Sequence, residues 1–182
     1  WELCADNLLD LSHTPFIHQK TVGIPEMAEL PFKTWVEGET VYQQRTMEQV
    51  TPSPFVAEWG NFAGKIDRVA TVEWVPAGNM AASLVYEDPT NSITLRLTNP
   101  LTPETDRTTH VWFAWSRDFG PTEDDHPDAI RFKEQSFAVM AEDVEIMGIQ
   151  QAAIDRGGPM RNPVPINADA TLVEARKVVQ KL

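Results

Sequence analysis

The feature that most constrains the fold of this 182-residue sequence is a central block, residues 32–116, that reads as a succession of β-strands. Short segments rich in Val, Ile, Thr and aromatic residues alternate apolar with polar side chains, and turns containing Pro, Gly, Asn or Asp separate them. We expect a hairpin over 32–50 and further strands at 65–75, 79–87, 91–99 and 108–116. Five or six such strands in succession predict one antiparallel sheet.

Helical patterns lie on both sides of this block. The first segment is expected to be a helix that runs to about His18, followed by a loop over 19–31. Residues 128–154 carry apolar side chains at helical spacing, and 168–182 form a short amphipathic helix after a break at 156–165. The apolar face of the long helix is expected to contain Ile130, Phe137, Met140, Val144 and Met147.

The order of these elements defines a fold class. A helix, a run of strands and a long helix form an α+β arrangement in which the helices pack on one side of the sheet. The length suits one domain with a sizeable core, so we expect a single domain over residues 1–182. A curved sheet with a helix laid across it encloses a cavity.

The composition excludes several classes of partner. The chain has 15 basic and 27 acidic residues, a net charge of −12, and no basic run, which argues against nucleic acid. No stretch is long enough to span a membrane, and the single Cys4 cannot form a disulfide within the chain. We therefore expect a cytoplasmic protein. The chain begins at Trp1 without an initiator Met or a signal-like run, which predicts a piece of a longer polypeptide.

The segment DNLLDLSHTPFIH is the strongest candidate for chemistry. Asn7, Asp10 and His13 follow at three-residue intervals, so on a helix neighbouring members are offset by roughly 60° and all three can face one site. His18 follows His13 by five residues, one more than the spacing that suits a shared metal on an unbroken helix. We expect Pro15 to bend the chain so that the two rings meet. The alternative is a buried amphipathic helix with incidental histidines.

A third metal ligand is expected from the long helix. Glu142, Asp143 and Glu145 are the candidates, although three neighbouring acidic residues can also form a solvated face. Asp143 is favoured because it adjoins the expected apolar side of the helix and its short side chain suits a fixed ligand.

These residues carry a resemblance to a known family. DNLLDLSHTPFIH resembles the NxxDxxHxxxxH mononuclear-iron motif of Rieske non-haem iron oxygenases, and FAVMAEDVEIMGIQQ resembles the segment that provides their aspartate ligand. TTHVWFAWSRDF and INADATLVEARKVVQKL resemble a strand and the terminal helix of the vanillate O-demethylase oxygenase group, so the resemblance covers essentially the whole chain. It implies a catalytic domain of the helix-grip (START/Bet v 1-like) type, with the N-terminal Rieske domain absent from this chain.

The resemblance also implies roles for individual residues. His13, His18 and Asp143 would be the triad that binds a mononuclear Fe(II). The Asp10 carboxylate would orient His13 and bridge to the Rieske cluster of a neighbouring subunit in a homotrimer. Asn7 would be a polar residue at the open side of the iron. The family usually has Glu where this chain has Gly148, and Gly inside a helix costs about 1 kcal/mol relative to Ala.

The activity implied is that of a monooxygenase that demethylates a methoxylated aromatic acid similar to vanillate. Electrons from NAD(P)H would arrive through a reductase or ferredoxin and a [2Fe-2S] Rieske cluster on a domain outside this chain, since one Cys cannot hold that cluster. Hydroxylation of the methyl group by O2 would give a hemiacetal that collapses to a phenol and formaldehyde.

Three alternatives remain open. A Rieske-type hydroxylase or dioxygenase of another aromatic compound would use the same ligands. A zinc hydrolase would also use two His and one Asp, but no Glu lies between the histidines as a general base. A non-catalytic helix-grip protein would carry an apolar ligand without any metal.

Overall fold

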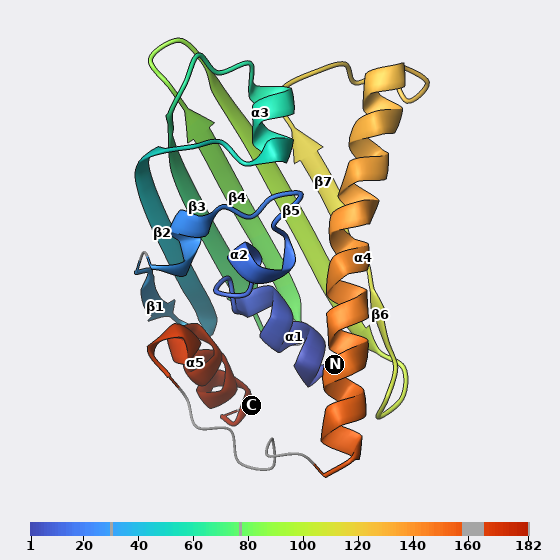
Figure 1. The fold of residues 1–182 in the computed structure, drawn as a ribbon. Coiled ribbons are helices and arrows are strands. Elements are labelled where there is room, and N and C mark those ends of the chain that lie inside the picture. Colours follow the sequence, from blue (N-terminus) through green and yellow to red (C-terminus); the bar gives the residue numbers. More distant parts are fainter. Residues whose placement is uncertain (30, 77, 158–165, 182) are drawn as a thin grey trace.

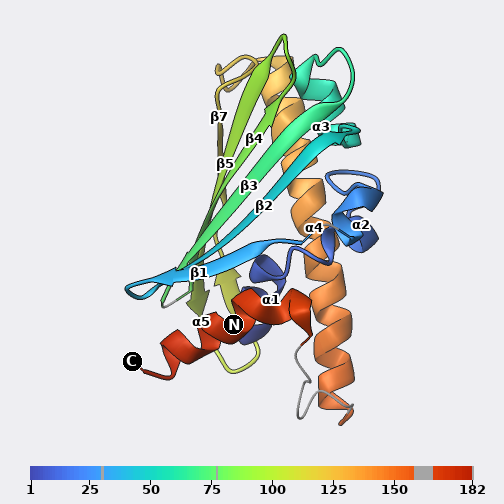
Figure 2. The same cartoon turned by 90° about the vertical axis from the view of Figure 1, so that its left-hand side faces the viewer.

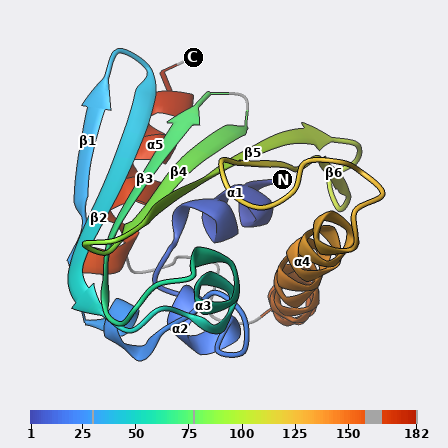
Figure 3. The same cartoon turned by 90° about the horizontal axis from the view of Figure 1, so that it is seen from above.

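A curved antiparallel sheet of seven strands forms the body of the protein, with helices on its concave side (Figures 1 and 3). The structure is a computed structural model that describes residues 1–29, 31–76, 78–157 and 166–181. The strands are β1 (Lys33–Glu37), β2 (Thr40–Val50), β3 (Ile66–Val75), β4 (Asn79–Glu87), β5 (Ser92–Pro103), β6 (Thr109–Val111) and β7 (Ala114–Arg117). Their order is β1-β2-β3-β4-β5-β6, and β7 also pairs with β5.

The helices confirm the predicted α+β class. They are α1 (Glu2–Leu9), α2 (Thr14–Ile17), η1 (Pro25–Ala28), α3 (Pro54–Gly60), α4 (Pro127–Asp155), η3 (Asn167–Asp169) and α5 (Ala170–Val179). The long helix α4 runs along the concave side of the sheet, and α5 lies against β1, β2 and α1 at one end (Figure 2). None of the helices in these ranges combines the length and the apolar character that crossing a membrane requires.

Alternation along the strands directs one set of side chains to the helices, because successive side chains of a strand point to opposite faces. The buried apolar side chains form two clusters on this face. The α3-side cluster contains Met47, Phe55, Val56, Ile66, Tyr86, Ile93, Leu95 and Phe132, together with Ile24, Met27 and Val50. The α5-side cluster contains Leu9, Val41, Val72, Trp74, Met80, Ala82, Leu172, Ala175 and Val178.

The last predicted strand, 108–116, is wrong as a single element. The structure divides it into β6 and β7, which pair with two successive parts of β5. Pro100 of β5 lies opposite the break and has no N–H to donate, so the hydrogen-bond ladder is interrupted there. Its carbonyl still accepts a hydrogen bond from the amide of Trp112.

The sequence analysis also missed a helix, α3, between β2 and β3. Ser53 is its N-cap residue and accepts a hydrogen bond from the amide of Val56, while Pro54 occupies the first turn. Both are start signals of a helix. The short helix η1 likewise lies where a loop was expected.

The first helix is shorter than predicted, because α1 ends at Leu9 rather than near His18. The side chain of Asp10 accepts hydrogen bonds from the backbone amide and the hydroxyl of Ser12, and such local bonds compete with helix continuation. Pro15 does not bend the chain, since it lies in the first turn of α2. The interruption of the predicted helix therefore precedes both histidines, which flank the short helix α2.

The predicted apolar face of the long helix is also wrong. The buried residues of α4 are Phe132, Ser136, Val139 and Asp143. Ile130, Phe137 and Val144 are exposed, and Met140 and Met147 are only half-buried, so none of the five expected residues belongs to the buried face. The buried face of α4 is the one that packs against the sheet and α1. It includes Ser136 and Asp143, which a pattern of apolar residues cannot identify.

Candidate metal centre

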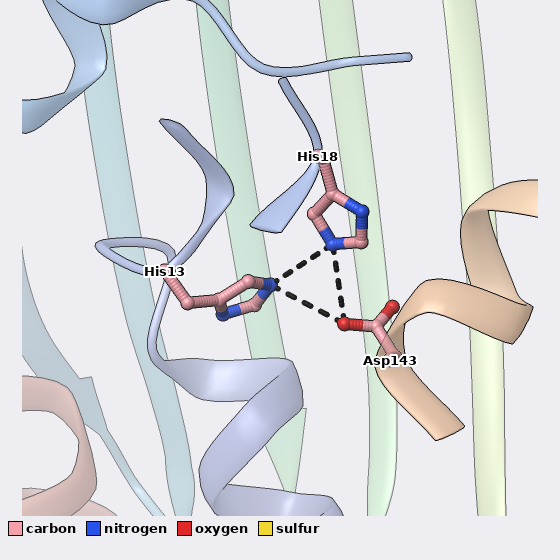
Figure 4. A group of neighbouring side chains, drawn as sticks. All are labelled: His13, His18 and Asp143. Atoms are coloured by element: carbon pink, nitrogen blue, oxygen red, sulfur yellow. Dashed lines mark hydrogen bonds and ion pairs between the residues drawn. The ribbon is translucent and has the colours of Figure 1, made fainter. Parts of the chain in front are cut away.

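Three side chains from separate parts of the chain meet between α1, α2 and α4. His13 precedes α2, His18 follows it, and Asp143 comes from the middle of α4 (Figure 4). Their donor atoms point toward one another and all lie within 4.8 Å. We refer to these three residues as the three-residue cluster. The structure thus brings together all three of the side chains that the sequence predicted as metal ligands, and their role as ligands stays a prediction.

The distances within the cluster suit one metal ion. The Nε2 atoms of His13 and His18 are 3.2 Å apart, and Oδ1 of Asp143 lies 3.1 Å from Nε2 of His18 and 3.5 Å from Nε2 of His13. Two ligand atoms bound at about 2.1 Å are separated by about 3.0 Å at a right angle and about 3.4 Å at a tetrahedral angle. Two imidazoles and one carboxylate in this arrangement fit non-haem iron or zinc.

The ring of His13 is oriented by the backbone. Its Nδ1 lies 2.5 Å from the carbonyl oxygen of Asp10, and because a carbonyl only accepts, Nδ1 donates and Nε2 faces the cluster. The expected contact from the Asp10 carboxylate is wrong, since that carboxylate binds Ser12 instead. Burial lowers the pKa of His13, so burial favours the neutral, metal-binding form of this ring.

His18 is oriented by a carboxylate that the sequence analysis had considered only as a metal ligand. His18 is 2% exposed, and its Nδ1 lies 2.7 Å from Oε2 of Glu142. The hydroxyl of Thr21 donates to the same oxygen at 2.9 Å. Burial disfavours the charged ring, but the hydrogen bonds with the carboxylates of Asp143 and Glu142 prevail and raise the pKa of His18.

The carboxylate of Asp143 is held in the same way. Asp143 is 6% exposed, and its Oδ1 accepts a hydrogen bond of 3.0 Å from Nδ2 of Asn7 on α1. Burial works against the ionised form, yet the hydrogen bonds from His18 and Asn7 lower the pKa of Asp143. Asn7 thus contacts a proposed ligand directly. Glu145, the third acidic candidate on α4, is exposed.

A pocket of about 400 Å³ lies beside the cluster, between α1, α4 and α5. The pocket is lined by Asn7, Asp10 and His13, together with residues of α4 and α5. His13 is thus the member of the cluster that lines this pocket, whereas His18 and Asp143 are buried and do not line it. The contacts of Glu142 with His18 and Thr21 and of Asn7 with Asp143 were not predicted, because each is made across more than a hundred residues.

Comparisons with known proteins find relatives over the whole length of this chain. A family model described as "Vanillate O-demethylase oxygenase C-terminal domain" matches residues 1–182. The chain is 29% identical over 198 residues to a vanillate O-demethylase oxygenase subunit from Pseudomonas sp. (strain ATCC 19151), covering all of this chain and 59% of that protein. The chain therefore spans little more than half the length of that relative.

Two solved structures have the same fold. The crystal structure of dicamba monooxygenase bound to dicamba aligns with a TM-score of 0.78 and 25% identity, over 99% of this chain and 54% of the other. A crystal structure of dicamba monooxygenase with non-heme iron and dicamba aligns with a TM-score of 0.62 and 23% identity, over 99% and 52% of the two chains.

Proposed function

Because this chain belongs to the family of vanillate O-demethylase oxygenase C-terminal domains, we propose that it is the catalytic domain of a Rieske-type aromatic monooxygenase. The proposed reaction is oxidative O-demethylation of a methoxylated aromatic acid. The relatives whose names include vanillate and dicamba support this choice of substrate class. One solved relative with non-heme iron supports Fe(II) as the metal.

The observation that carries this proposal is the three-residue cluster, in which His18 and Asp143 are buried and the second ring nitrogen of each histidine has an orienting contact. Buried imidazoles and carboxylates are costly to assemble unless they bind one another or a metal. Here each histidine directs Nε2 inward, while the other ring nitrogen is held by Asp10 or Glu142. Second contacts of this kind orient metal ligands and raise their basicity.

The chain's own residues have three tasks in the proposed mechanism. His13, His18 and Asp143 hold the metal, which when bound as Fe(II) supplies the activation of dioxygen for methyl hydroxylation. Asn7 fixes the carboxylate of Asp143, and Glu142 keeps the proton on Nδ1 of His18. The apolar clusters exclude water from the concave side of the sheet, so that the substrate is positioned in a dry environment.

Electron delivery extends beyond this chain. We propose that a [2Fe-2S] Rieske cluster on a domain outside residues 1–182 supplies the electrons, and that a reductase or ferredoxin reduces it. The position of Asp10 at the pocket beside His13 supports an approach of this domain from that side. A homotrimer in which a neighbouring subunit contributes the Rieske domain stays a prediction, as does a cytoplasmic location.

The alternatives make different predictions for the cluster. A carrier of apolar ligands has no need of two histidines and an aspartate with converging donor atoms, of which His18 and Asp143 are buried and His13 is half-buried. A zinc hydrolase needs a general base, and Glu142 is engaged by His18 and Thr21 instead of facing the cluster. A Rieske-type hydroxylase or dioxygenase would share all of these features and differ in its product.

Metal analysis and product analysis test the proposal together. Full-length protein purified without oxygen is expected to contain one mononuclear iron per chain in addition to its Rieske cluster. With NADH and a reductase, it should release formaldehyde and a phenol from a methoxylated benzoate. Stoichiometric zinc with no such product would support the hydrolase, and protein without any mononuclear metal would contradict the proposal.

A further inference from the structure

A band of buried polar side chains crosses the concave face of the sheet between the two apolar clusters. On β2, Gln43 and Arg45 lie between Val41 of the α5-side cluster and Met47 of the α3-side cluster. On β3, Arg68 occupies the corresponding place. Arg45 is 3% exposed and Arg68 is 9% exposed, so two arginines are buried where the α+β fold would ordinarily place core residues.

The buried atoms that lack hydrogen-bond partners among the described residues belong to this face. They are Nε of Arg45, Nε of Arg68, Nε1 of Trp74, Nε1 of Trp115 and Oε1 of Gln43. Four of these five atoms are N–H donors. Buried donors without acceptors are rare in folded proteins and destabilise them. The face therefore has an excess of donors that an acceptor-rich ligand would satisfy.

The two arginines are close enough to bind one group. Arg45 pairs with Ala70, and Arg68 pairs with Met47, so the arginines are diagonal neighbours on the same face of β2 and β3. Neither belongs to an ion pair with a carboxylate in the parts of the chain that the structure describes, and Nη1 of Arg45 donates to the carbonyl of Met27. Burial is the main cause that lowers the pKa of Arg45, the Arg68 guanidinium lowers it further, and the Asp10 carboxylate acts in the opposite direction.

The arginine pair lies under the segment that carries both histidines. Gln43, two residues before Arg45 on the same face, donates to the carbonyl of Leu9 at the end of α1. Arg45 itself donates to Met27 in η1. The chain between these two contacts contains His13 and His18, and Figure 1 shows this segment in front of the sheet. An anion bound by the pair would thus lie between the sheet and the metal centre.

We propose that Arg45 and Arg68 together bind the carboxylate of the aromatic acid substrate. This inference rests on the proposed function and assigns its specificity for acids to two residues. The guanidinium group presents paired donors that match the two oxygens of a carboxylate, and it stays charged when buried. The single negative charge of the substrate carboxylate would offset one of the two positive charges, and its two oxygens would accept hydrogen bonds from the unpaired Nε–H groups of Arg45 and Arg68, while the flanking apolar clusters contact its ring.

Binding of matched acids and amides tests the proposal without turnover. The probes are 2-, 3- and 4-methoxybenzoate and the corresponding methoxybenzamides, which have similar shape and no charge. Affinities are measured by calorimetry on the full-length enzyme in the absence of oxygen. At least one acid is expected to bind about 10- to 100-fold more tightly than its amide, the range for a charge-assisted hydrogen bond in a buried site. No preference for the acid in any of the three pairs would overturn the proposal.

Two substitutions test whether Arg45 and Arg68 cause the preference for the acid over the amide. Arg68→Met and Arg45→Met should each weaken the binding of the preferred acid by about 10- to 100-fold and change binding of the amide by less than about threefold. Arg96→Met is the matched control, because Arg96 is exposed on β5, and it should retain the full preference. Folded Arg68→Met protein that keeps the parental preference for the acid would overturn the proposal.

Thermal unfolding separates this role from a structural one. Removing a buried charge that has no carboxylate partner should leave the melting temperature of ligand-free Arg68→Met protein unchanged or higher, and the rise caused by the preferred acid should disappear. A lower melting temperature with an undiminished response to the acid would overturn the proposal. If Arg45→Met does not fold, Arg45→Lys keeps the charge but loses the paired donors, and it should lose at least part of the preference. These measurements need no catalysis. They therefore test acid binding by the arginines even if the enzyme does not carry out the proposed O-demethylation.

Discussion

Glu142→Gln tests whether the carboxylate behind His18 strengthens metal binding. The structure places Oε2 of Glu142 at 2.7 Å from Nδ1 of His18, and the amide oxygen of Gln can still accept this hydrogen bond. The change therefore removes the charge and keeps the geometry. A hydrogen bond to a charged group contributes about 1.5–3 kcal/mol and a neutral one about 0.5–1.5 kcal/mol, so the loss is about 1 kcal/mol.

The Glu142 side chain is 28% exposed, so solvent reduces this loss somewhat. We expect Fe(II) to bind Glu142→Gln about three- to tenfold more weakly, since 1.4 kcal/mol corresponds to a factor of ten. Glu142→Ala also frees the ring of His18 to rotate and should weaken binding by about 10- to 100-fold. Thr21→Val, which removes the hydroxyl that fixes Glu142, should have a smaller effect in the same direction.

Competition between the metal-free protein and a chromophoric chelator, under anaerobic conditions, measures the affinity. Glu145→Gln is the matched control, because it makes the same change of charge on the exposed side of the same helix. Circular dichroism checks that each variant is folded. An unchanged affinity in Glu142→Gln would refute the reasoning, and an equal loss in Glu145→Gln would attribute the effect to net charge rather than to orientation of His18.

Four further changes have defined outcomes. Alanine at any position of the three-residue cluster should abolish iron binding while circular dichroism shows an intact sheet, and stoichiometric iron in all three variants would refute the ligand assignment. The Asp10→Asn variant of the full-length enzyme should keep its iron, because the backbone carbonyl of residue 10 still holds the ring of His13. Reoxidation of its reduced Rieske centre, followed by stopped-flow spectroscopy, should be slower than in the parent enzyme. An unchanged rate would remove Asp10 from the electron path. Hydrogen bonds from Thr90 and the amide of Ala63 lower the pKa of Asp88 to about 2, below its unfolded value of about 3.9. In urea unfolding, the wild-type protein should therefore be more stable than Asp88→Asn above about pH 5, and this difference should be lost as the pH falls toward 2. A difference that does not depend on pH would contradict this. Gly148→Ala should raise the free energy of unfolding in urea by about 0.5–1 kcal/mol, since its Cβ would meet nothing within 4 Å, and a loss of stability would show that this site does not tolerate a side chain.

Local patterns in the sequence determined most of the elements of this fold. The strand at 79–87 has the predicted bounds, and the hairpin at 32–50 and the long helix lie within a few residues of theirs. Alternation and helical spacing are properties of neighbouring residues, so they are readable without the fold. The same holds for His13 and His18, whose spacing in a short motif marked them as a pair, and for the free Cys4.

Contacts across the chain decided the rest. Which face of α4 is buried depends on the sheet and α1, and this is why Asp143 lies inside while Val144 is exposed. The contact of Glu142 with His18 spans 124 residues, and no local pattern distinguishes it from the solvated Glu145.

The arginine pair shows the same division. Alternation along each strand directs Arg45 and Arg68 inward, which is a local property, but their pairing follows from the register between β2 and β3. An ion-pair partner for a buried charge can come from any helix or strand that packs against it, so its presence depends on the whole fold. The sequence by itself therefore identified the candidate ligands and the strands that frame them, whereas the tertiary structure alone decided which polar side chains are buried together, because burial is a property of the assembled fold and not of any segment.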